Sequence, residues 1–152
     1  MSELDHLVDD HRRALEGEAW HGPALRDLLR GVTAKRAAAR PIAEAHTIWE
    51  IVLHIEAWDR VVIARLAGQP IELSDEEDWP TVRVTTEATW KRATKSMETT
   101  HGKLNRAIAS VSVGRLDKPY VPGGQNNLAH LIHGIIQHEL YHAGQIAVLK
   151  KA

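Results

Sequence analysis

Two histidines near the end of the chain are spaced so that a single metal ion could bind both. Residues 138–142 read His-Glu-Leu-Tyr-His within a mostly apolar run. Histidines four positions apart lie one turn from each other on the same face of an α-helix, which brings both imidazoles within reach of one ion. The same string matches H-E-x-x-H, the motif in which two histidines bind zinc and the glutamate is the general base of a peptidase.

The residues after this motif argue against a zinc peptidase. Such peptidases take a third protein ligand, a Glu or a His, from farther along the chain. Residues 143–152 contain no His, Glu, Asp or Cys. A third side-chain ligand must therefore lie upstream. Taken alone, the two histidines could also be ordinary core or surface residues.

The elements that would position these histidines are helices, because the hydrophobic pattern shows no convincing strand. Thr47 and Glu50 have the spacing of a capping box at the start of one long helix, and Asn126 or Asn127 can cap another. The acidic stretch 71–79 is expected to be a loop. Long helices are expected over about 3–16, 47–67, 86–110 and 127–150.

Four long helices with Gly and Pro in their connections are typical of an all-α four-helix bundle. Short extra helices are expected between the first and second long helices, on both sides of Gly31. The length of 152 residues corresponds to one domain with its own core. We therefore expect a single domain over residues 1–152.

A metal ion in a helix bundle is held by side chains that project inward from facing helices. At 100° per residue, His138 and His142 share the apolar stripe of the last helix, and His54 lies on or beside the apolar face of the second long helix. A lone histidine there is more often a hydrogen-bonded core residue. Together, however, the three imidazoles match the count in catalytic metal sites, which keep a fourth position for water or substrate.

The other histidines are left out of this set. His130 and His133 fall off the stripe of the last helix, on a shoulder and on nearly the opposite side. The rest stand in polar neighbourhoods or near helix ends and are expected at the solvated surface. These are His6, His11, His46 and His101.

Three segments carry a resemblance to a known family. They are 18–23 (Glu-Ala-Trp-His-Gly-Pro), 48–55 (Ile-Trp-Glu-Ile-Val-Leu-His-Ile) and 138–146 (His-Glu-Leu-Tyr-His-Ala-Gly-Gln-Ile). With these segments the chain resembles the DinB/YfiT-like superfamily of metal-dependent four-helix-bundle proteins over nearly its whole length. The resemblance implies that His54, His138 and His142 bind one divalent ion. It also implies that H-E-x-x-H needs no downstream ligand here.

What the resemblance implies about the reaction is less uniform. Some relatives are transferases or isomerases that use a low-molecular-weight thiol such as bacillithiol, mycothiol or glutathione, and others are suggested to be hydrolases. The imidazole ligands suit zinc and nickel best and also allow iron. The favoured interpretation is a metal-dependent enzyme acting on a small molecule, either a thiol-dependent S-transferase or a hydrolase. The alternative is a metal-binding protein without catalysis, in stress response or metal buffering.

Glu139, Gln145 and His21 are secondary catalytic candidates. Glu139 could act as a general base beside His138, although pairing within or between helices is favoured. Gln145 could orient a water or a substrate, or be a satisfied buried amide. His21 lies with Trp20 in a Gly-bounded break and could contact substrate, with loop packing as the alternative.

Two further residue groups have structural interpretations. Glu50 could support His54 through the second ring nitrogen, but capping is the favoured role. The other four tryptophans are expected in the core or at a pocket rim rather than as stacking platforms. They are Trp49, Trp58, Trp79 and Trp90.

The composition limits compartment and partners. There is no cysteine, so any thiol chemistry needs an external thiol. The net charge of −1 argues against nucleic acid and anionic membranes as partners, and no apolar run is long enough to span a bilayer. The N-terminus lacks a signal-peptide core, so we expect a cytoplasmic protein. Because Ile132, Ile136 and Leu140 widen the apolar face of the last helix, we also expect a homodimer.

Overall fold

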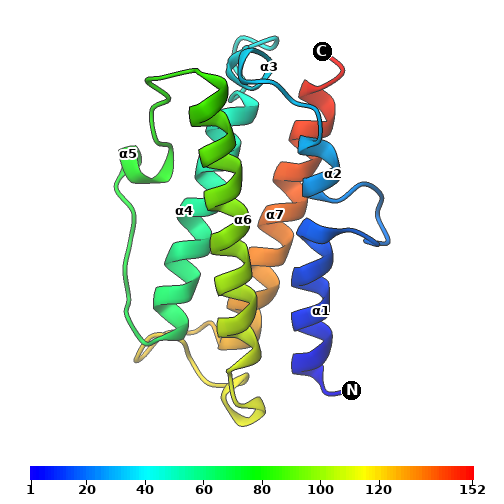
Figure 1. The fold of residues 1–152 in the computed structure, drawn as a ribbon. Coiled ribbons are helices and arrows are strands. Elements are labelled where there is room, and N and C mark those ends of the chain that lie inside the picture. The colour runs from blue at the N-terminus through cyan, green and yellow to red at the C-terminus, as the bar shows by residue number, and fades with distance from the viewer.

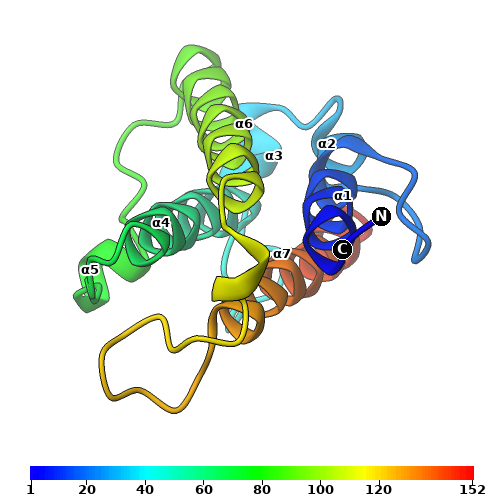
Figure 2. The same ribbon diagram turned by 90° about the horizontal axis from the view of Figure 1, so that it is seen from below.

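Four long helices form the body of the protein in the computed structural model, which describes residues 1–152. Seen along their length in Figure 1 and nearly end-on in Figure 2, they surround a common interior. The long helices are α1 (Glu3–Glu16), α4 (Ile48–Leu66), α6 (Glu87–Ala109) and α7 (Leu128–Leu149). No strand is present, and the predicted all-α four-helix bundle is confirmed.

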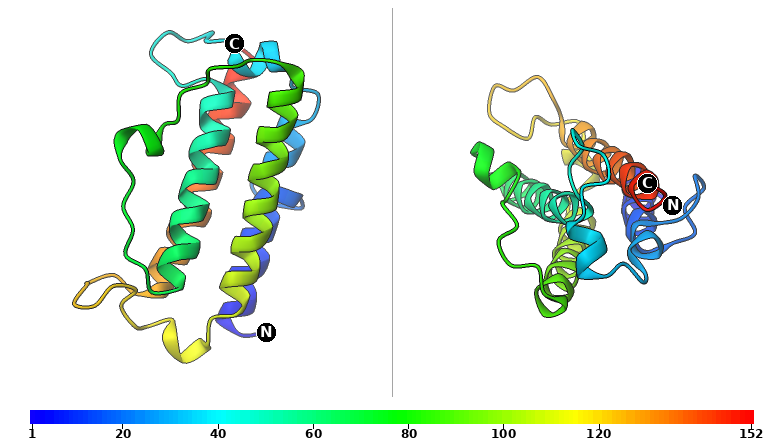
Figure 3. Two further views of the ribbon diagram at one scale, coloured as in Figure 1. Left: turned by 60° about the vertical axis from the view of Figure 1, so that its left-hand side comes forward. Right: turned by 90° about the horizontal axis from the view of Figure 1, so that it is seen from above.

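Short helices occupy the connections. The predicted extra helices between the first two long ones are α2 (Leu25–Leu29) and α3 (Ala34–Ala38). The stretch 71–79, expected to be a loop, contains the short helix α5 (Asp75–Asp78). This segment lies along the outer side of α4 (Figure 3). A 3₁₀ turn, η1 (Val113–Arg115), precedes α7.

Side-chain caps begin the helices that matter for the site. Thr47 Oγ1 accepts from the backbone N–H of Glu50 at 3.1 Å, and the Glu50 carboxylate accepts from the N–H of Thr47 at 2.8 Å. Asn127 Oδ1 accepts from the N–H of His130 and so caps α7. Satisfying these otherwise unpaired N–H groups fixes where α4 and α7 start, and therefore the register of their inward faces.

The interior consists of two apolar clusters with a polar layer between them. Along α4, Ile55 belongs to the cluster at the end of the bundle where α7 ends, and Val62 to the cluster at the end where α7 begins. Glu56 and Asp59, which lie between them in α4, are also buried. Because burying an unpaired charge is unfavourable, these carboxylates near the middle of α4 need hydrogen-bonding or charged partners on the facing helices. The other buried polar residues are His11, Thr47, His54, Thr100, His101, Glu139 and His142.

The apolar face that motivated the expected homodimer is covered within the chain. Ile132 and Ile136 are buried in the same cluster as Leu4 and Leu7 of α1, and Leu140 packs against that cluster while partly buried. The homodimer therefore stays a prediction that this face no longer supports. None of the helices combines the length and apolar character that crossing a bilayer requires.

Candidate metal centre

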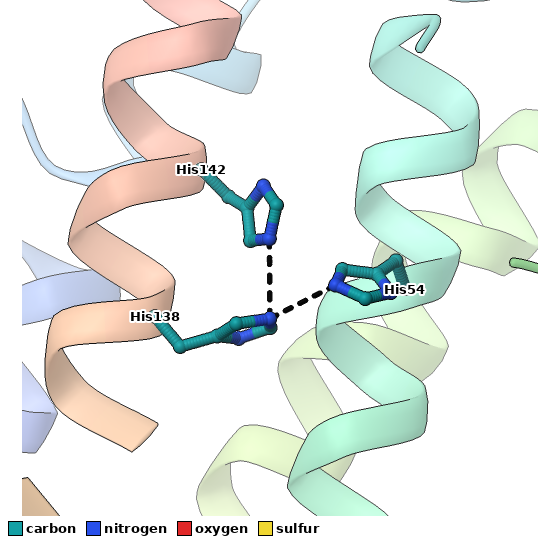
Figure 4. A group of neighbouring side chains, drawn as sticks. All are labelled: His54, His138 and His142. Atoms are coloured by element: carbon teal, nitrogen blue, oxygen red, sulfur yellow. Dashed lines mark hydrogen bonds between the residues drawn. The ribbon is translucent and has the colours of Figure 1, made fainter. Parts of the chain in front are cut away.

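Three histidine rings meet between α4 and α7. His54 extends from α4, and His138 and His142 extend from successive turns of α7 (Figure 4). Nε2 of His138 lies 2.9 Å from Nε2 of His54 and 3.1 Å from Nε2 of His142. His54 and His142 are buried and His138 is partly buried. The structure thus brings the three sequence-predicted ligands to one point.

In two of the three rings, those of His54 and His142, the outer nitrogen is held so that the inner one presents a lone pair. Nδ1 of His54 donates to the backbone carbonyl of Asp78 at 2.7 Å, and Nδ1 of His142 donates to Oε1 of Gln145 at 2.6 Å. A neutral imidazole that donates through Nδ1 is an acceptor at Nε2. Nδ1 of His138 is buried without a hydrogen-bond partner. Orienting the outer nitrogen is how proteins set the tautomer of a metal-binding histidine.

Two tryptophans hold His54 from outside. The ring of Trp79, which follows α5, stacks on His54 with centroids 3.8 Å apart, and His46 stacks on Trp79 at 3.5 Å. Nε1 of Trp58 donates to Oδ1 of Asp78 at 2.7 Å. Trp79 was expected in the core or at a rim, but its flat stack makes it part of the wall that fixes His54.

Burial keeps the three imidazoles neutral. It is the largest cause of a lowered pKa at His54, His138 and His142. At His138, burial and then the neighbouring charges of His142 and His54 lower the pKa to about 3. Since only neutral imidazole binds a metal, the rings are in their ligand form at neutral pH.

The donor set fits a divalent cation. Ligand atoms on a tetrahedral ion with bonds of about 2.0–2.1 Å lie about 3.3 Å apart, close to the two Nε2 separations quoted above. Nε2 of His54 and Nε2 of His142 both present lone pairs toward Nε2 of His138, which has at most one proton to share between them. The triad could therefore bind a metal ion with three protein ligands, which leaves at least one position open.

A cavity reaches the triad from the lower half of the bundle. It has a volume of about 190 Å³ and is lined by His138, Trp58 and Arg65, together with Gly134 and apolar residues of α4 and α7. The Arg65 guanidinium lies 5.7 Å from the Trp58 ring centroid. This cavity offers a small molecule an apolar wall and one positive charge beside His138.

Glu139 does not contact the triad. Its Oε1 lies 3.0 Å from Nδ1 of His101 and 3.5 Å from Nε2 of His11, and its side chain is 1% exposed. Pairing between helices, the favoured alternative for Glu139, is what the structure shows. The placement of His11 and His101 at the solvated surface was wrong, because both are buried around this carboxylate.

Two further carboxylates were missed as interior residues. Glu56 of α4 is buried and accepts hydrogen bonds from Ser96 and Thr100. Burial and then the negative charge of nearby Glu139 raise the pKa of Asp59 well above its usual value. Burial alone would raise the pKa of Glu139 too, but His11 and His101 outweigh it and lower that pKa.

The remaining candidates lie around the triad or away from it. Gln145 supports His142 through the hydrogen bond described above. Glu50 caps α4 and also accepts from Arg40, and its carboxylate makes no hydrogen bond to His54. His21 is exposed in the connection after α1, beside a surface hollow that contains Trp20 and no member of the triad.

Comparison with known proteins supports the assignment of the fold. The family model described as the DinB superfamily matches residues 19–146, which include all three histidines of the triad. No curated protein matches the chain.

Proposed function

Because the chain belongs to the DinB superfamily, we propose that it is a metal-dependent enzyme that transfers a low-molecular-weight thiol to a small electrophile. His54, His138 and His142 hold one divalent cation. The observation that carries this proposal is the convergence of their Nε2 atoms at separations of 2.9 and 3.1 Å. Zinc and nickel suit this donor set best, and iron(II) is also compatible.

A bound cation would activate a nucleophile that comes from outside the chain. A divalent ion lowers the pKa of a thiol or water that it binds, so that the nucleophile is ionised at neutral pH. The chain has no cysteine, so the sulfur must come from a separate molecule. That sulfur forms the new bond to carbon, and the leaving group departs with its electron pair.

The carboxylates near the triad favour a thiol over water as the nucleophile. Hydrolysis is helped by a side chain that removes a proton from water. Glu139 faces His101 and His11 instead, and the Asp78 carboxylate accepts from Trp58 behind His54. A thiol needs less help, because its pKa is far below that of water.

Arg65 supports recognition of an anionic group. It lines the cavity beside His138 and lies over both Trp58 and Tyr120, with its Cζ 5.7 and 5.8 Å from their ring centroids. Its Nη2 donates to the backbone carbonyl of Ile71 at 3.2 Å, and the other guanidinium donors can bind a carboxylate. Glutathione and bacillithiol carry carboxylates, so Arg65 can orient either molecule with its sulfur toward the triad.

The test uses untagged protein in which cobalt(II) replaces the native ion. Adding glutathione, bacillithiol or mycothiol should produce a sulfur-to-cobalt charge-transfer band, and the same thiol should support turnover of an electrophile such as chlorodinitrobenzene. His138→Gln should abolish both signals, whereas His133→Gln, on an exposed position of α7, should keep them.

Other results would replace the proposal. Ester cleavage without any thiol, lost in His138→Gln, would identify a hydrolase. Tight metal binding with neither thiol binding nor turnover would leave a metal-binding protein without catalysis. Peptide cleavage abolished by Glu139→Gln would point to a peptidase, against the orientation of that carboxylate.

A further inference from the structure

A second group of metal-ligating side chains lies in the core, on a different face of α7 from the triad. His11 from α1, His101 from α6 and Glu139 from α7 offer ligand atoms that all lie within 4.8 Å of one another. The three side chains are 0%, 2% and 1% exposed. The proposed thiol transfer does not use any of them.

The ligand atoms in this group are spaced as they would be around one ion. Oε1 of Glu139 lies 3.0 Å from Nδ1 of His101 and 3.5 Å from Nε2 of His11. The two imidazole rings stack nearly parallel with centroids 3.9 Å apart, so both present an edge to the same carboxylate. These separations bracket the ~3.3 Å expected between ligands on a small tetrahedral cation.

Several buried polar atoms here have no hydrogen-bond partner. They include Nε2 of His11 and Oε2 of Glu139, and also both carboxylate oxygens of Asp59 on α4. Nδ1 of His11 pairs with Oδ1 of Asn105 at 3.0 Å, so this nitrogen donates and Nε2 carries a lone pair. In the neutral imidazole, Nε2 of His11 is then an acceptor 3.5 Å from a carboxylate oxygen, and a cation between the two atoms would satisfy both.

We propose that His11, His101 and Glu139 form a second site for a divalent transition-metal ion, with Asp59 beside them to complete its coordination. Two imidazole nitrogens and carboxylate oxygens suit zinc, iron(II) or manganese(II), and they suit neither copper(I) nor calcium. A divalent cation at this point would balance the charge of the Glu139 carboxylate and favour the ionised form of Asp59 beside it. The four residues come from the four long helices, one from each.

This second ion has a structural role. Its ligands are at most 2% exposed, so no substrate reaches it. Held by α1, α6 and α7, the ion joins these helices between the apolar clusters at either end of the bundle. Structural metal sites are closed by protein ligands in this way, whereas catalytic sites keep an open position.

The test counts metal ions in untagged full-length protein grown with zinc, by elemental analysis. Wild-type protein should hold two zinc ions per chain. His142→Gln should lose the ion of the triad and keep one, and His101→Gln should lose the buried ion and keep one. His133→Gln, exposed on α7, is the control and should keep both.

A second variant protects the test against a disturbed core. Glu139→Gln keeps the volume of the side chain and removes the ligand charge, so it should also hold one zinc ion. In the His142→Gln background, zinc should raise the melting temperature, and the further change His101→Gln should abolish that rise. These readouts do not depend on enzyme activity.

The outcomes separate this site from the triad. A single zinc in wild-type protein that vanishes in His142→Gln overturns the second site and leaves the proposed function standing. Two zinc ions that survive both His101→Gln and Glu139→Gln also overturn it. Loss of zinc in His101→Gln with none lost in His142→Gln would support the buried site and contradict the triad.

Discussion

At the scale of single residues, the geometry of the triad depends on the hydrogen bonds made by the outer ring nitrogens as well as on the positions of the three rings. His54 and His142 each donate through Nδ1 to a fixed oxygen, whereas Nδ1 of His138 has no partner. His138 is also the ring that contacts both others. His138 therefore occupies the centre of the site. Replacing it should weaken metal binding more than replacing a residue that only supports one of the ligands.

We predict that His138→Ala lowers the affinity for zinc by about tenfold or more, because a ligand is removed outright. Competition with a chromophoric chelator measures this affinity. An unchanged affinity and stoichiometry would place the metal site elsewhere in the molecule.

Gln145→Ala should weaken zinc binding by about tenfold while leaving the stoichiometry unchanged. The substitution leaves Nδ1 of His142 without its acceptor, so the ring loses its fixed tautomer and orientation. Gln137→Ala, at an exposed position of the same helix, is the matched control. Equal affinities for the two variants would show that the Gln145 contact does not support metal binding.

The lowered pKa of His138 predicts how stability changes with pH once the metal is removed. Between pH 6.5 and about 3, the unfolded chain binds a proton at His138 that the folded chain does not. Stability must therefore fall as pH decreases through this window. Denaturant titrations of chelator-treated protein should show a shallower fall for His138→Gln than for wild type, and a wild-type slope for His133→Gln.

At the scale of elements, the four-residue helix α5 positions one ligand of the triad, His54. Ser74 and Glu77 cap each other's backbone at its start, and its last residue, Asp78, accepts from His54 while Trp79 stacks on the same ring. The helix is exposed and contributes nothing to either apolar cluster except the partly buried Trp79. It serves to position one ligand.

Two capping substitutions should therefore have different effects. Thr47→Ala removes the cap of α4 and should lower the free energy of unfolding by about 1 kcal/mol. Ser74→Ala should change global stability little but weaken zinc binding, because α5 frays and releases Asp78 and Trp79. Denaturant titration and chelator competition on both variants test this contrast. A Ser74→Ala variant with wild-type zinc affinity would show that α5 does not position His54.

The long helices and the three histidines of the triad could be predicted from the sequence, because both depend on local patterns. Apolar periodicity placed His138 and His142, and the capping box of Thr47 and Glu50 set the start of α4. Burial of His11 and His101 could not be read in this way, because each stands among polar neighbours on its own helix. Their partner, Glu139, is supplied by another helix.

The short helix α5 was missed for a different reason. Its four residues are all acidic, so no apolar periodicity marks them as helical. The signal that could have found it is the spacing of Ser74 and Glu77, a capping box like the one recognised at Thr47. The cap was present in the sequence, but a single helical turn offers no pattern beyond it.

At the scale of the whole molecule, a polar layer crosses the bundle between two apolar clusters, and every long helix contributes to it. Such a layer favours one register, because sliding a helix by a turn would leave buried charges without partners. Metal binding at this level should therefore stabilise the entire fold rather than one corner of it.

The predicted homodimer is tested at this scale. The apolar residues that suggested it are covered by α1 of the same chain, so sedimentation equilibrium at micromolar concentration decides the matter directly. A dimer would have to use another surface. A monomer would show that the prediction is wrong, with Ile132 and Ile136 covered only by residues of their own chain.

The stacked tryptophan has a practical consequence. Trp79 lies flat on one ring of the triad, and Trp58 has its ring centroid 5.9 Å from that of His138. Indole emission is quenched by paramagnetic ions at such short range, while Trp20, fully exposed on its loop, lines a hollow that contains no residue of the triad. The tryptophans therefore act as an intrinsic probe of the site, and loading with nickel or cobalt should dim the emission of Trp58 and Trp79 while the red-shifted emission of Trp20 remains.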